Sequence, residues 1–148
     1  MSKQRKQSPA EIVEDLLAKL ASSHAGERRD AAVKLAERVR RDKTLREQPK
    51  LLEAFVRALA DPVTRLPAVQ ALGWMRAKSA LEALCGYLDD PSHNVRVVAC
   101  EALGAIGDPA ALPKLRERYE RADEAERGWA LGHAIEKLER AVDRPAEP

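Results

Sequence analysis

Residues 89–104, which read DDPSHNVRVVACEALG, decide the fold because their parts recur along the chain. Leu103-Gly104 occurs again as Leu72-Gly73 and as Leu131-Gly132, and the Asp-Asp-Pro turn is matched by Ala60-Asp61-Pro62. A single copy is too small to close a hydrophobic core on itself, so the copies must stack against one another. The sequence therefore predicts an all-α protein, an α-solenoid of about four stacked antiparallel helix pairs.

Composition narrows the class of protein. Charged residues make up 34% of the 148 residues and aromatic residues only 3%, and no stretch alternates apolar and polar residues as a strand would. The 26 basic and 24 acidic side chains leave a net charge of +2, which argues against a general polyanion binder. No apolar run approaches the ~20 residues needed to cross a bilayer, so no membrane association is expected. The two cysteines give no disulfide framework and no zinc-ligand spacing, which favours a reducing, cytoplasmic location.

A leucine ladder marks the second helix of each repeat. Its members are separated by 37, 31 and 28 residues and are Leu35, Leu72, Leu103 and Leu131. A small residue follows each leucine, and in three repeats it is glycine. Glycine inside a helix costs about 1 kcal/mol relative to alanine, so we expect the backbones of neighbouring helices to approach closely there.

The pattern predicts one domain over residues 8–141, between a disordered basic tail at 1–7 and a disordered tail at 142–148. The repeats are expected at 8–48, 49–77, 78–107 and 108–141. Proline at helix starts and glycine at helix ends give the helix bounds. The eight helices are predicted at 9–21, 27–41, 49–60, 64–77, 79–88, 93–106, 110–121 and 124–141.

The third repeat resembles a known family. Its residues Asp90-Pro91-Ser92-His93-Asn94-Val95-Arg96, Ala102-Leu103-Gly104 and Ile106-Gly107-Asp108-Pro109 are similar to the short HEAT-like repeat of the phycobilisome-lyase type. The resemblance implies a HEAT-repeat solenoid and says little about activity, because fold and function are separable.

Members of this family are similar in placing an arginine early in the second helix. Arg28, Arg65 and Arg96 occupy that position here, whereas Glu124 replaces it in the last repeat. The structural interpretation is that these arginines bind the carbonyl ends or acidic turns of a neighbouring repeat, and the alternative is a ligand-binding role.

Three activities occur on similar solenoids. Di-iron hydroxylases use His-Glu pairs as metal ligands. In this chain no histidine is followed by glutamate, because alanine follows His24 and His133 and asparagine follows His93, so that chemistry is expected to be absent. Glycosylases use a basic groove with aromatic residues, which the near-neutral charge does not favour. Bilin lyases need pigment-binding partners. We therefore expect no catalytic residues, no metal and no cofactor.

The second helices of stacked pairs are expected to line a concave face. Both tryptophans fall at positions predicted to be accessible there, where aromatic side chains anchor protein interfaces. Folding of either indole into the core is the alternative. The predicted partner-binding residues are Leu66, Gln70, Trp74, Val97, Glu101, Trp129 and His133, with possible basic contacts at Arg29, Arg40 and Arg41.

The sequence thus predicts a non-enzymatic scaffold or adaptor that binds a protein or peptide on its concave face, as a monomer or with weak self-association. The first alternative is a nucleic-acid-binding domain, although nucleic acid is not the expected partner. The second is an enzyme subunit of the lyase type. The groove of the nucleic-acid alternative would carry Arg28, Arg29, Arg40, Arg41, Lys43, Lys78 and Lys137.

Overall fold

The computed structural model describes residues 4–144, which form helices and connecting turns without strands. The α-helices are α1 (Pro9–Lys19), α2 (Ala25–Arg41), α3 (Pro49–Ala58), α4 (Arg65–Trp74), α5 (Leu81–Gly86), α6 (His93–Ile106), α7 (Leu112–Arg121), α8 (Glu124–Glu126) and α9 (Gly132–Asp143). Short 3-10 turns lie between them, of which Lys43–Glu47 fills the connection between the first two repeats. None of these described helices is long and apolar enough to cross a membrane.

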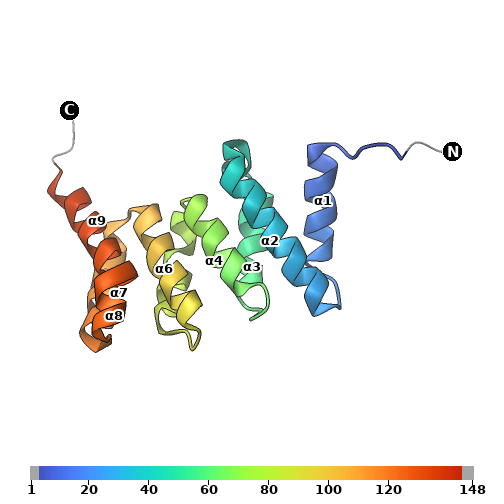
Figure 1. Ribbon diagram of the computed structural model, residues 1–148. Coiled ribbons are helices and arrows are strands. Elements are labelled where there is room, and N and C mark those ends of the chain that lie inside the picture. The colour runs from blue at the N-terminus through green and yellow to red at the C-terminus, as the bar shows by residue number, and fades with distance from the viewer. Residues whose placement is uncertain (1–3, 145–148) are drawn as a thin grey trace.

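The helices pair in sequence and the pairs line up in a row, from α1 at one end to α9 at the other (Figure 1). Within the pairs, α1 contacts α2, α3 contacts α4, α5 contacts α6 and α7 contacts α9. Between pairs, the second helices form a continuous layer, because α2 contacts α4, α4 contacts α6 and α6 contacts α9. This arrangement is the predicted α-solenoid of helix pairs.

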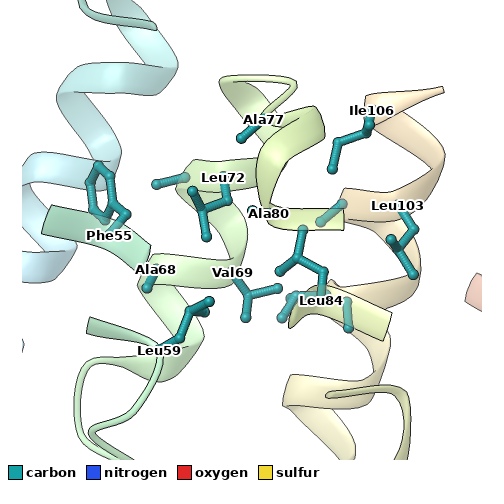
Figure 2. Close-up of a cluster of buried hydrophobic side chains, with 14 of the residues drawn as sticks. Phe55, Leu59, Ala68, Val69, Leu72, Ala77, Ala80, Leu84, Leu103 and Ile106 are labelled. Atoms are coloured by element: carbon teal, nitrogen blue, oxygen red, sulfur yellow. The ribbon is translucent and has the colours of Figure 1, made fainter. Parts of the chain in front are cut away.

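The core is continuous from one repeat to the next. The central rung of the first helices is buried in every repeat: Leu16, Phe55, Leu84 and Leu115. The leucine ladder of the second helices is also buried throughout, with Leu131 the most exposed at 3%. Figure 2 shows Phe55, Leu72, Leu84 and Leu103, from α3, α4, α5 and α6, spread from left to right through one cluster, so each repeat completes the core of its neighbour.

The glycines that follow the ladder leucines differ in how much room they leave for a Cβ atom. A Cβ added at Gly73 would lie 2.8 Å from the Ala102 Cα, so the close backbone approach predicted from the sequence is confirmed between α4 and α6. A Cβ at Gly104 would lie 3.6 Å from the Ala134 Cα, which is ordinary van der Waals contact. A Cβ at Gly132 would meet the Arg127 carbonyl oxygen of its own helix at 2.5 Å.

The last repeat departs from the predicted single helix at 124–141. Residues Arg127–Leu131 form a π-helical turn between α8 and α9, and Trp129 has the non-helical angles φ −115° and ψ −108°. The Trp129 carbonyl oxygen lies 3.0 Å from Nδ1 of His133, which provides it with a side-chain partner. Insertions of this kind widen a helix locally and are frequent at functional sites.

The last helix extends past its predicted end, whereas the first helix begins at its predicted residue. Helix α9 continues to Asp143, two residues into the segment predicted as the C-terminal tail. At the N-terminus, Ser8 caps α1 by accepting a hydrogen bond from the Glu11 backbone N–H, so the first helix begins where the Ser-Pro signal placed it. The remaining parts of the two predicted tails, residues 1–3 and 145–148, lie outside the described residues.

Candidate functional site

Three arginines join consecutive repeats along one edge of the solenoid. Arg28 Nε lies 2.8 Å from Asp61 Oδ2, and Arg65 Nη1 lies 3.1 Å from Asp90 Oδ2. Arg96 Nη2 lies 2.7 Å from Glu126 Oε1. Each arginine thus binds an acidic residue of the next repeat, which confirms the structural interpretation of these side chains.

The same arginines also bind the carbonyl ends of the preceding helices. Arg65 Nε donates to the Leu59 carbonyl oxygen at 2.8 Å, and Arg96 Nη1 donates to that of Asp90 at 2.9 Å. In the last repeat this role belongs to Arg127, whose Nε donates to the Tyr119 carbonyl oxygen at 2.8 Å. This arginine stands three residues after Glu124, the residue that the repeat pattern placed at this position.

The second helices leave a strip of accessible side chains, which we call the second-helix face. Its residues from the sequence prediction are Leu66, Gln70, Trp74, Val97, Glu101, Trp129 and His133. The side chains from α4, together with Val97, are half-buried, whereas Glu101, Trp129 and His133 are exposed. Trp129 stands out because 67% of it is exposed. Its indole does not enter the core, so the alternative that it folds into the core is wrong for this residue.

An apolar pocket of about 260 Å³ opens beside Trp129. We call it the Trp129 pocket; it is lined by Leu88, His93, Arg96, Val97, Cys100, Arg118, Ala125, Glu126, Trp129, Ala130 and Leu131. Its apolar side chains come from α6, from α8 and the π-helical turn, and from Leu88 just before α6. The Trp129 backbone leaves the helical path beside this pocket.

A partly buried ion-pair network forms one wall of the Trp129 pocket. The Glu126 carboxylate is held between Arg96 and Arg118, with Arg118 Nη2 at 2.6 Å from Oε2. Cys100 lies at the pocket, 3% exposed, and burial raises the pKa of its thiol to about 12. That thiol therefore stays protonated near neutral pH and acts as a small apolar surface. The sequence prediction missed Cys100, Arg118 and Glu126, because only the folded chain brings α6, α7 and α8 together.

The other half of the second-helix face carries Trp74. The Arg40 guanidinium lies 6.0 Å from the centroid of the Trp74 ring and at 2.6 Å from Glu37 Oε1. Arg41 also pairs with Glu37, at 2.9 Å. Two of the three predicted basic contacts are thus already paired with an acidic residue, while Arg29 is exposed on α2.

The described residues do not form a metal site. Within residues 4–144, no group of three or more His, Cys, Asp or Glu side chains is close enough to act as ligands. His93 Nδ1 comes within 3.9 Å of Glu126 Oε1, but that carboxylate is occupied by two arginines. The donor set of this part of the chain therefore does not fit a metal centre.

Comparison with known proteins changes the functional conclusion. The chain is 39% identical over 125 residues to deoxyhypusine hydroxylase from Gallus gallus, a match that covers 80% of this chain and 42% of the relative. The chain thus spans less than half the length of that relative. The relative is an enzyme by its name, so the prediction of a non-enzymatic scaffold or adaptor is wrong, as is the prediction that the protein is not an enzyme. The reason is that the prediction rested on the fold and on missing motifs, and neither excludes descent from an enzyme.

The family itself is defined by the repeats. The family model of HEAT repeats matches residues 48–136, from the start of α3 into the first turn of α9. This range holds the leucine ladder of three repeats and two of the three arginine junctions. The chain therefore belongs to the HEAT-repeat family.

Proposed function

We propose that this chain acts in an enzyme related to deoxyhypusine hydroxylase, and that its second-helix face binds the substrate. The observation that carries the proposal is the exposed Trp129 indole beside an apolar pocket. The identity to the hydroxylase supplies the class of enzyme, and the name of that enzyme gives the amino acid on which it acts.

The energetics of Trp129 favour a binding role. An indole is among the largest apolar side chains, and leaving it in water forgoes about 25 cal/mol for each Å² of apolar surface. The chain has only two tryptophans, and here one of them is turned outward by a distorted backbone. A ligand group placed in the Trp129 pocket would contact Val97 on one side and the indole on the other, which would recover that free energy.

The proposal concerns binding and orientation of the substrate. Since the described residues do not fit a metal centre, we assign no step of a hydroxylation to them. The fixed arginines around Glu126 make the pocket wall rigid, because each charged group there is already paired. A rigid wall lowers the entropy lost on binding.

The experiment compares two labelled peptides that differ only in one amino acid, deoxyhypusine or lysine. Binding to the purified chain is measured by fluorescence anisotropy, and peptide mass after incubation reports any gain of an oxygen atom. We expect tighter binding of the deoxyhypusine peptide, and we expect Trp129→Ala to weaken it about tenfold or more, the effect of losing one aromatic anchor.

Val56→Ala is the matched control, because Val56 is also an exposed apolar residue, 40% exposed, but lies on α3 away from the second-helix face. It should leave peptide affinity unchanged. The proposal fails if the two peptides bind equally well, or if the two variants weaken binding to the same extent.

Finer features of the chain are also proposals. We propose that the repeats are of the short phycobilisome-lyase type, supported by the 31- and 28-residue spacing of the leucine ladder. A cytoplasmic location is supported by the two free thiols of Cys85 and Cys100. A monomer or weak self-association is supported by the exposed charged residues Glu136, Lys137 and Arg140 of α9, and light scattering over a concentration series tests it.

A further inference from the structure

Glu101 lies between the two tryptophans of the second-helix face. A small pocket of about 70 Å³ on one side of it is lined by Gln70 and Trp74 as well as Glu101. A second pocket, of about 260 Å³, lies on the other side and is lined by Glu101, Trp129 and His133 among others. One carboxylate is therefore shared by two pockets, each of which has an indole in its wall.

The Glu101 carboxylate carries a charge that the described residues do not neutralise. Within residues 4–144, no basic nitrogen lies within 4.0 Å of it, although Glu37 on α2 and Glu126 on α8 are each paired with two arginines. Lys137 lines the same pocket as Trp129 without forming an ion pair with Glu101. Exposed glutamates are common, but this one has aromatic walls beside it.

Carboxylate and indole together favour a cation. An ammonium group placed over an indole is attracted by the ring face, and a carboxylate beside it adds an ion pair. The Trp74 indole already has the Arg40 guanidinium over it, so this face binds a cation within the fold itself. The Trp129 ring is tilted against His133, with 6.0 Å between centroids, and among the described residues no Lys or Arg is placed over it.

We propose that Glu101 and the Trp129 indole bind an organic ammonium group, so that the second-helix face takes an amine-bearing ligand. The inference rests on the proposed function for placing this site in substrate binding, but the cation site itself can be tested with a simple amine. In this arrangement the Glu101 carboxylate accepts the ammonium N–H groups while the indole contacts the carbon atoms next to the nitrogen.

The experiment follows the two indole N–H resonances of the chain by NMR, with 1,4-diaminobutane as the probe and 1,4-butanediol as its neutral counterpart. We expect the diamine to shift the Trp129 resonance more than the diol does. Glu101→Gln should weaken diamine binding about threefold to fivefold at low salt, the range of an exposed ion pair. Glu82→Gln makes the same change in net charge on α5 and should have no such effect.

The outcomes separate the two proposals. The cation site is overturned if diamine and diol shift the resonance equally, or if Glu101→Gln and Glu82→Gln weaken binding to the same extent. The proposed function can survive that result, because binding of the deoxyhypusine peptide is measured separately. Conversely, diamine binding that depends on Glu101 supports the cation site even if the deoxyhypusine and lysine peptides bind equally well.

Discussion

The contact between α4 and α6 gives a prediction that can be worked out from distances. At Gly73 a new methyl group would lie 2.8 Å from the Ala102 Cα, a backbone atom that cannot turn away. At Gly104 the corresponding methyl group would lie 3.6 Å from the Ala134 Cα, in ordinary contact. The two glycines occupy the same position of consecutive repeats, so Gly73→Ala and Gly104→Ala form a matched pair.

The two substitutions should have opposite effects on the free energy of unfolding. Replacing a glycine in a helix by alanine gains up to about 1 kcal/mol from helix propensity. Overpacking a dense core costs roughly 1–3 kcal/mol. Gly73→Ala carries both contributions and should destabilise the protein by about 1–2 kcal/mol. Gly104→Ala carries only the first and should be neutral or stabilising by up to about 1 kcal/mol.

Thermal unfolding followed by far-UV circular dichroism measures the difference. For a chain of this size, 1 kcal/mol corresponds to roughly 2–4 °C in Tm, so a difference of about 1–3 kcal/mol should separate the two variants by about 2–12 °C. Urea unfolding at constant temperature provides an independent value. If Gly73→Ala is as stable as Gly104→Ala, the close approach of α4 and α6 is wrong, and so is our explanation of this glycine.

Three further predictions concern the repeat junctions and a buried thiol. Arg65→Met should lower the free energy of unfolding in urea by about 1–3 kcal/mol, because it leaves the Asp90 carboxylate, 8% exposed, without its cation. The Arg28 hydrogen bond lowers the pKa of Asp61 below its usual 3.8, so the stability gained from this pair is present above pH 3.8 and is lost as the pH falls through the lowered pKa. Asp61→Asn should therefore be less stable than the wild type at neutral pH, with the difference shrinking in acid-unfolding experiments. The Cys100 thiol, with its pKa raised to about 12, should react with a thiol reagent at neutral pH only on unfolding.

A control variant or a contradicting result is defined for each of these predictions. Arg57→Met removes an arginine that is 81% exposed and pairs with Glu53 only at 3.6 Å, so it should change stability by less than about 0.5 kcal/mol. An equal loss in the Arg57 and Arg65 variants would contradict the role of the junction. A stability difference for Asp61→Asn that does not vary with pH would show that charge is not its cause. Rapid labelling of the folded Cys85→Ser variant would show that Cys100 is accessible.

The candidate site was only partly predictable from the sequence. Helical periodicity placed Trp129, Glu101 and His133 on one accessible face, and the structure finds these three residues exposed. It did not predict the Trp129 pocket, because residues from α6, α7, α8 and the π-helical turn come together there only in the folded chain. The non-helical backbone of Trp129 also leaves the apolar pattern on both sides without a visible signal.

The relationship to an enzyme could not be predicted from the residue pattern either. The absence of His-Glu pairs led the sequence analysis to expect no hydroxylase chemistry, yet the chain is related to a hydroxylase. A motif search tests whether particular ligands are present in this chain. It does not test whether the chain shares its descent with an enzyme.

The sequence by itself determined the solenoid. The recurring leucines and turn residues are local signals. A helix pair with one apolar side buries that side by stacking on the next pair. The tertiary structure alone decided which ladder glycine touches a neighbouring backbone, which arginine takes the last junction, and where a pocket opens beside Trp129. These features depend on differences of less than an ångström in the spacing of helices and on one distorted turn. The periodicity of the residues does not encode either of them.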